Sequence, residues 1–389
     1  MLPPVIDKML QSVDLKKNLL PFLRYSGWVD SPEKNKNWIV LHGEMDIYGH
    51  PIELVFPNES NSYEEKQSYI IKAVALITAL KKQPMQIVLQ SIISYDRDLF
   101  YVRNLETNDN NAIVLQLAVS QINNIKSTLE YSASLEKNAK PYFVNVNSSA
   151  RKIVNNFLFG HTFAGSFGFT VETPRLPEPL KFIQKRLPFE EEEDMSLVNI
   201  PYERRIMERV ARGLTYTKEA EEARNHNILI NEYPSGFNSN MCSSVIGILN
   251  NKRTDVEFRI TWSPKVKPSE DVEGLQPIKI KENGYEILDY AAKELKKRTP
   301  EFITISGHVK ALTSSDNPLN LGTRRAVVIR TLLPNTNRES NVIIELERDD
   351  YAKANKAHIK WQNIQVSGIL SRSGTGWRLL NVQGFKILT

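Results

Sequence analysis

Phe302-Ile-Thr-Ile-Ser-Gly-His-Val-Lys-Ala-Leu312 is the stretch that decides the fold of the C-terminal part of the chain, because its β-branched and apolar residues predict a strand. Gly307 lies inside this stretch, and a glycine within a strand is typical of a bend or a bulge. Residues 325–333 and 341–347 have the same character and predict the next two strands. Strands that bend in this way suit a sheet that curls into a small barrel.

The segments that follow complete the order of elements. Residues 351–358 are rich in Ala and Lys and follow aspartates that can cap a helix. Residues 363–370 alternate like a strand, and residues 377–388 predict a last strand. Three strands, a helix and two strands are the order of a five-stranded OB-type barrel. We therefore predict an OB-like β-barrel at 301–389, with an open antiparallel sheet covered by one helix as the alternative.

The rest of the chain predicts an α+β multidomain protein, because helices and strands mix without a strict βαβ rhythm. Residues 1–172 are expected to form a mixed α/β domain and residues 201–300 a middle region of helices and strands. Residues 173–200 are rich in proline and include the acidic run 190–194. That composition predicts an exposed, extended linker between the two regions.

Hydrophobic periodicity predicts the individual elements of these regions. The expected helices are 5–23 (one or two), 63–82, the later part of 112–137, 202–223, 241–249 and 285–297. The expected strands are 38–47, 52–56, 85–93, 99–102 and 255–262, with a glycine-punctuated hairpin at 157–171.

Composition predicts an ordinary globular protein that stays away from the membrane. Hydrophobic residues make up 41% of the 389-residue chain and charged residues 24%. A single cysteine, Cys242, cannot support a disulfide framework and fits a reducing, cytoplasmic environment. No apolar run is long enough to cross a membrane.

The positive charge is concentrated in the predicted barrel. Residues 302–389 contain 12 Lys and Arg against 6 Asp and Glu, whereas the remainder contains 38 against 39. A nucleic-acid interface is therefore expected in the barrel if the protein has one. The candidates for phosphate contacts are Arg324, Arg325, Arg330, Lys360, Arg372 and Arg378. The predicted second and third strands contain no aromatic residue, and Trp361, Trp377 and Phe385 lie elsewhere, which argues against base stacking on those strands.

The first predicted hairpin holds a weak metal candidate. Side chains repeat every two residues along a strand, so His42, Glu44 and Asp46 share one face and could hold a divalent cation. Metal-dependent nucleases with this arrangement usually place a lysine two residues after the carboxylate of the second strand. Here Val55 stands two residues after Glu53. We therefore expect no metal and no cofactor, and we keep a metal-dependent nuclease at this hairpin as an alternative.

Other chemical motifs have simpler structural explanations. The glycine-rich segment around His161 and Thr162 does not end in the Gly-Lys-Ser/Thr of a phosphate-binding loop. Its glycines predict a tight hairpin instead. Cys242 has apolar neighbours and favours a buried, unreactive side chain. The arginines of residues 204–212 could clamp phosphates, but Glu208 lies four residues from both Arg204 and Arg212 and favours pairing within the helix.

The sequence contains the segments Phe159-Gly-His-Thr-Phe-Ala-Gly-Ser166, Pro201-Tyr-Glu-Arg-Arg205, Gly236-Phe-Asn-Ser-Asn-Met-Cys242, Thr261-Trp-Ser-Pro264, Ala354-Asn-Lys-Ala-His358 and Val366-Ser-Gly368. Together these segments resemble a set of uncharacterised bacterial proteins of similar length. The resemblance covers most of the chain from Phe157 onward, and it implies a bacterial intracellular protein without indicating an activity.

These observations favour a non-enzymatic accessory or adaptor subunit of a bacterial cytoplasmic assembly. It would bind partner proteins, and nucleic acid through the basic OB-like module. The first alternative is a nucleic-acid-binding protein that follows phosphates without sequence specificity, and the second is the nuclease described above. A role in nucleic-acid processing or antiviral defence is a hypothesis that rests on the basic barrel.

Overall fold

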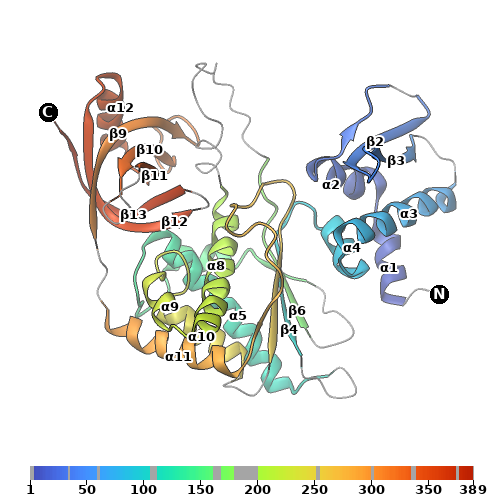
Figure 1. Cartoon of the computed structure of the whole chain (residues 1–389), viewed down its shortest axis with the longest axis horizontal. Coiled ribbons are helices and arrows are strands. Elements are labelled where there is room, and N and C mark those ends of the chain that lie inside the picture. Colours follow the sequence, from blue (N-terminus) through green and yellow to red (C-terminus); the bar gives the residue numbers. More distant parts are fainter. Residues whose placement is uncertain are drawn as a thin grey trace. The chain divides into compact units, whose positions relative to one another are not determined.

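The computed structural model shows a chain that divides into two compact units (Figure 1). It describes residues 4–33, 36–58, 62–105, 112–160, 168–178, 200–250, 255–298, 302–333, 339–373 and 376–388. The first unit comprises residues 1–99, 175–179 and 261–267, and the second comprises residues 100–174, 180–260 and 268–389.

These units divide the chain differently from the boundaries expected at 172, 200 and 300. Residues 100–172 belong with residues 201–260, because strands from both segments pair in one sheet. The acidic run of the expected linker lies outside the described residues. Of the described part, Thr173 and Leu176 are buried, and the Leu176 N–H donates to the Asp96 carbonyl oxygen.

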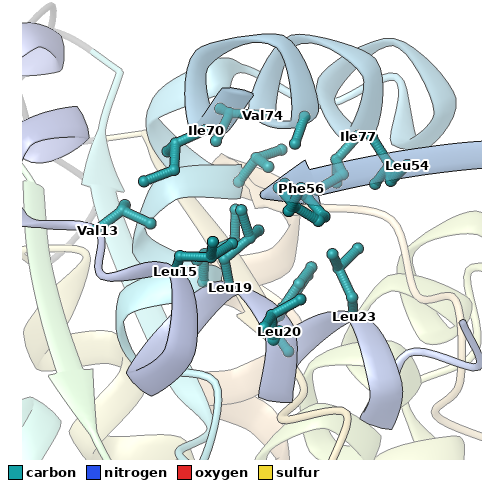
Figure 2. Close-up of a cluster of buried hydrophobic side chains, with 14 of the residues drawn as sticks. Val13, Leu15, Leu19, Leu20, Leu23, Leu54, Phe56, Ile70, Val74 and Ile77 are labelled. Atoms are coloured by element: carbon teal, nitrogen blue, oxygen red, sulfur yellow. The ribbon is translucent and has the colours of Figure 1, made fainter. Parts of the chain in front are cut away.

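The first unit is a small α+β unit with a three-stranded antiparallel sheet in the order β1-β2-β3. Its helices are α1 (Pro4–Ser12), the π-helix η1 (Leu15–Leu19), α2 (Leu20–Tyr25), α3 (Tyr63–Lys81) and α4 (Met85–Ile93). Its strands are β1 (Val29–Asp30), β2 (Trp38–Met45) and β3 (Pro51–Pro57). Figure 2 shows apolar side chains from β3, α3 and residues 13–23 converging on one core, which burial of apolar area stabilises.

The strand predicted at 85–93 is wrong, because these residues form helix α4. A short, continuous apolar run fits a buried strand or a buried helix equally well. Pro84 stands at the start of the helix, and Val88, Leu89 and Ile92 recur at helical spacing and are buried. Packing against α1 and α3 therefore decides the structure of this segment.

The second unit begins with a five-stranded sheet in the order β5-β6-β4-β7-β8. Its strands are β4 (Leu99–Asn104), β5 (Leu158–Phe159), β6 (Gly168–Glu172), β7 (Val256–Thr261) and β8 (Ile278–Ile280). Its helices are α5 (Leu115–Lys137), α6 (Ser148–Val154), α8 (Tyr202–Ala223), α9 (Asn227–Asn231), α10 (Ser239–Ile248) and α11 (Glu282–Lys297). Helices α5, α8, α10 and α11 contact one another, and all four were expected from periodicity (Figure 1).

The C-terminal part of the second unit is a closed five-stranded barrel, as the element order predicted (Figure 1). It consists of β9 (Ile303–Ser314), β10 (Arg325–Leu332), β11 (Glu339–Glu345), α12 (Arg348–Ile359), β12 (Asn363–Ser373) and β13 (Gly376–Ile387). Strand β13 closes the barrel by pairing in parallel with β11, and the other pairs are antiparallel. This is the strand connectivity of an OB-like barrel.

Two glycines permit the close contacts between strands of the barrel. A Cβ atom at Gly307 would lie 2.1 Å from the carbonyl oxygen of Arg330 on β10. A Cβ atom at Gly368 would lie 2.6 Å from the carbonyl oxygen of Leu380 on β13. Both positions therefore require glycine because a neighbouring backbone occupies the space of a side chain.

Among the described residues, no helix is long and apolar enough to cross a membrane.

Candidate functional site

Arg325 and Arg378, two of the six basic residues proposed from the sequence, are buried inside the protein. Arg325 is 6% exposed, and its guanidinium donates to the carbonyl oxygens of Pro318, Thr323 and Asn320 at 2.6–2.9 Å. It therefore holds the loop before β10 in place. Arg378 is 5% exposed and lies against Glu136 and Glu345.

Arg324, Arg330 and Lys360 have different surroundings. Arg324 donates from Nε to Glu345 Oε1 at 2.9 Å and is partly buried. Arg330, with 61% of its side chain exposed, pairs with Glu339 at 2.7 Å, and Lys360 is exposed. The side chain of Arg372 lies outside the described residues. The structure therefore does not gather the six candidates into one exposed basic surface.

Arg330 nevertheless belongs to an open face of the barrel that carries an aromatic platform. His308 on β9 is the cross-strand partner of both Arg330 on β10 and Asn363 on β12, so these side chains point outward together. The indole of Trp361 stacks on the imidazole of His308, with ring centroids 4.8 Å apart and planes 16° apart. Trp361 is 69% exposed, so the outer surface of its ring is open to solvent.

The backbone holds Trp361 in an unfavourable conformation. The Trp361 N–H donates to the His358 carbonyl oxygen at 3.1 Å, and the Gln362 N–H donates to the Ala357 carbonyl oxygen at 2.9 Å. This is the hydrogen-bond pattern that ends a helix with a left-handed residue, usually glycine. Trp361 has a φ of +53°, which costs a bulky residue about 1 kcal/mol relative to glycine. Trp361 therefore occupies a position at which the backbone accommodates glycine more easily.

Further polar and basic side chains surround this platform. Gln365 on β12 is the cross-strand partner of Ser306 on β9 and of Lys386 on β13, so these three also face outward. Lys386 is exposed. We call His308, Arg330, Trp361, Gln365 and Lys386 the Trp361 face. Sequence patterns missed it because Trp361 follows a helix and reaches the sheet only through its stacking on His308.

The buried candidates meet in a second place, a cavity of about 680 Å³ between helices α5 and α8 and the barrel. Among the residues that line it are Glu136 of α5, Arg205 of α8, and Arg324, Glu345 and Arg378 of the barrel. We call this cavity the arginine cleft. It was not predicted, because the contacts join residues far apart in the sequence.

Salt bridges connect the walls of the arginine cleft. Arg205 Nη1 lies 3.6 Å from Glu136 Oε2 and 3.3 Å from Glu345 Oε1. Arg378 Nη1 lies 3.4 Å from Glu136 Oε2, and its Nη2 donates to Glu345 Oε1 at 2.5 Å. Burial alone would raise the pKa of Glu136, but the charges of Arg209, Arg205 and Arg378 outweigh burial and hold it at about 2.

The arginines of α8 are structural members of a buried helix. The predicted pairing of Glu208 with Arg212 is confirmed, with 3.1 Å between Oε2 and Nη2. Arg212 Nε also lies 2.7 Å from Asp271 Oδ2. The side chain of Arg209 instead reaches a partner on another helix, Glu136 of α5. No acidic residue lies three or four positions from Arg209 in the sequence, and this is the signal for a partner elsewhere in the chain.

The metal candidates of the first hairpin have other partners. His42 Nε2 lies 3.2 Å from Glu53 Oε1, its cross-strand neighbour. The Asp46 carboxylate accepts the backbone N–H groups of Tyr48 and His50 at 2.8 and 2.9 Å, which shapes the turn. Glu44 is exposed. Within the described parts of the chain, no group of three His, Cys, Asp or Glu is arranged to hold a metal ion.

The structure describes the remaining sequence motifs in part. Strands β5 and β6 form the predicted hairpin, but residues 161–167 lie outside the described residues. Cys242 is buried, as predicted, and burial raises the pKa of its thiol. Comparison with known proteins gives no match to any protein-family model, curated protein or solved structure.

Proposed function

We propose that this protein is a non-enzymatic accessory subunit of a cytoplasmic assembly and that it binds single-stranded nucleic acid through the Trp361 face. The observation that carries the proposal is the exposed Trp361 ring, which stacks on His308 and is held in the left-handed conformation. A tryptophan ordinarily has an unstrained backbone and a largely buried ring. Strained backbone conformations are concentrated at functional positions.

The chemistry of the surrounding face supports single-stranded nucleic acid as the ligand. An exposed aromatic ring stacks a base of any identity and contributes about 1–3 kcal/mol per base. Arg330 and Lys386 flank the ring on the same outer face, where they can contact phosphates, and Gln365 offers hydrogen bonds to sugar or base. A duplex buries its base faces, so it could not use the Trp361 ring.

The non-enzymatic part of the proposal rests on how the candidate catalytic side chains are used. His42 is paired with Glu53, and Asp46 accepts two turn N–H groups. These partners occupy the groups that a hairpin nuclease would need. Cys242 is buried and burial raises the pKa of its thiol, which argues against a reactive nucleophile. A single cysteine in the chain fits a reducing environment.

A protein partner is the second candidate ligand of this region. Ile359 and Leu332 are 76% and 55% exposed, and both lie on the barrel elements that carry the Trp361 face. Apolar side chains of this kind would be buried by a partner protein and left exposed by an oligonucleotide. The binding experiment described next distinguishes a nucleic-acid ligand from a protein partner.

The test is the binding of fluorescently labelled, single-stranded DNA and RNA oligonucleotides by the full chain, followed by anisotropy at several salt concentrations. We expect little sequence preference and an affinity that falls with salt, because phosphates release counterions. Trp361→Gly should weaken binding by about 5- to 150-fold, the loss of one stacked base. Arg330→Gln combined with Lys386→Gln should reduce the salt dependence.

Matched variants make the result specific to the aromatic ring. Trp361→Phe retains a ring and should retain most of the affinity, whereas Trp361→Gly removes the ring and relieves the backbone strain. The glycine variant is therefore expected to fold at least as stably as the parent protein. Equal binding by the parent and Trp361→Gly would reject the platform. If oligonucleotides fail to bind while Ile359→Ser abolishes co-purification of a protein, the face is a protein-docking surface instead.

A further inference from the structure

The arginine cleft lies apart from the Trp361 face and presents a different chemistry. Three of its arginines come from separate segments, with Arg205 on α8, Arg324 before β10 and Arg378 on β13. They meet around the carboxylates of Glu136 and Glu345. Since the cavity has a volume of about 680 Å³, it has the size of a small-molecule site.

Positive charge is in excess in the cluster of side chains that contact Glu136 and Glu345. Glu345 Oε1 alone is contacted by Arg205 at 3.3 Å, Arg324 at 2.9 Å and Arg378 at 2.5 Å. Glu136 is shared by Arg205, Arg209 and Arg378. Among the described residues, this cluster therefore sets four guanidinium groups against two carboxylates. Unbalanced buried charge is costly unless an ion of the opposite sign accompanies it.

Two N–H donors of the cluster have no acceptor. Arg205 Nε and Arg324 Nη2 are buried, and neither has a hydrogen-bond partner among the described residues. Both side chains line the cavity, and Arg205 is only 7% exposed. A buried guanidinium donor without an acceptor costs free energy, and an oxyanion in the cavity would supply acceptors.

The electrostatics of the cluster point the same way. Burial, followed by the nearby charge of Arg205, lowers the pKa of Arg324 and lowers that of Arg378 to about 9. The guanidinium groups are thus held together against their mutual repulsion. A bound anion would reverse this effect, because it favours the protonated form of each arginine.

Further carboxylates in the lining of the cavity restrict which anion can bind. Glu203, Glu347 and Asp350 also line it. A continuous polyanionic strand would be repelled by these carboxylates, whereas the hydroxyl or amino groups of a small molecule could donate to them. The lining therefore favours a ligand with a negative group at one end and hydrogen-bond donors at the other.

We propose that the arginine cleft binds a small organic phosphate, with its phosphate group against Arg205, Arg324 and Arg378 and its donor groups toward Glu203, Glu347 and Asp350. Guanidinium groups are suited to phosphate because their planar N–H pairs match two phosphate oxygens. Since the cleft is built from α5, α8 and the barrel, a bound phosphate also links these elements. This site is independent of nucleic-acid binding at the Trp361 face.

The test uses the full chain and isothermal titration calorimetry with AMP, ribose 5-phosphate, inorganic phosphate and adenosine at constant ionic strength. AMP and ribose 5-phosphate are expected to bind and to raise the unfolding temperature. Inorganic phosphate should bind more weakly, because it has no second group that donates hydrogen bonds to Glu203, Glu347 and Asp350. Adenosine should give no binding, since it lacks the phosphate group.

Variants assign the binding to the cleft. Arg324→Gln removes a partly exposed cluster member and should lower the affinity for AMP at least tenfold while the protein stays folded. Arg205→Gln removes a buried member of the cluster and should also lower the affinity for AMP. Arg330→Gln on the Trp361 face is the control that should bind AMP like the parent. The proposal is overturned if none of the phosphates binds at millimolar concentration, if adenosine binds as tightly as AMP, or if Arg324→Gln binds like the parent.

Discussion

Arg209 Nη2 lies 2.7 Å from Glu136 Oε1, and both side chains are almost completely buried. The pair joins α8 to α5, and Arg209 also donates to the carbonyl oxygens of Pro234 and Gly236. Through Glu136 it is connected to Arg378 on the last strand of the barrel. One buried salt bridge thus belongs to a network that holds the helices and the barrel of the second unit together.

Replacing Arg209 by methionine should destabilise the protein strongly. The methionine fills similar space but leaves the carbonyl oxygens of Pro234 and Gly236 without this donor and Glu136 with one fewer charge partner. Breaking one side of a buried pair typically costs about 3–5 kcal/mol. Urea unfolding followed by circular dichroism measures the loss. The exposed Arg330→Met variant is the control and should change stability by no more than about 1 kcal/mol.

Glu136 should make the stability of the protein depend on acid pH. Its folded pKa of about 2 lies below the ordinary value of 4.5, so its contribution is fully present above pH 4.5 and is lost as the pH falls through 2. The shift corresponds to about 3 kcal/mol. Unfolding free energies of the parent and Glu136→Gln should therefore differ at neutral pH and converge between about pH 4.5 and 2.

The surface variant Glu339→Gln provides the comparison for this pH dependence. Glu339 pairs with Arg330 at 2.7 Å, but most of its side chain is exposed. Its variant should follow the parent over the whole pH range, because solvent screens surface pairs. A difference between the parent and Glu136→Gln that stays constant with pH would contradict the depressed pKa.

Gly307→Ala should damage the barrel specifically. The added Cβ would lie 2.1 Å from a backbone oxygen of β10, which cannot move without breaking the pairing of β9 with β10. We expect a loss of at least about 2 kcal/mol, at the upper end of the range for overpacking. Thermal unfolding measures it, with the exposed Ser306→Ala as the neighbouring control. An unchanged unfolding temperature would mean that the strands of the barrel are further apart than described.

Cys242 should resist thiol reagents in the folded protein. It is buried, and burial raises its pKa, so the reactive thiolate is scarce at neutral pH. Ellman's reagent at pH 8 should label Cys242 slowly in buffer and within seconds in denaturant. Rapid labelling without denaturant would show that α10 opens readily.

The sequence predicts local order better than it predicts partners. The barrel follows from its element order and from Gly307, because each of these signals is local. Helix α4 does not, since its apolar run fits two structures and only packing against α1 and α3 selects one. The compact units also depend on distant contacts, because β4 and β7 pair across more than a hundred residues of chain.

The candidate sites show the same limit. Charge counting directs attention to the barrel, but it cannot separate Arg330, which is exposed, from Arg378, which is buried against Glu136. The two partners in that pair are 242 positions apart. Trp361 lies outside the predicted strands, so the sequence does not indicate it as a stacking platform, yet its stacking on His308 brings it onto the sheet. Such contacts arise only once the chain has folded.

The parallel pairing of β13 with β11 also sets an order of events during synthesis. On the ribosome, β9 to β12 emerge before β13, and the barrel stays open at the edge of β11 until β13 arrives. Arg378 is carried by β13, so Glu136 and Glu345 lack one of their arginines up to that moment. The arginine cleft therefore lacks Arg378 until β13 has been synthesised and has paired with β11.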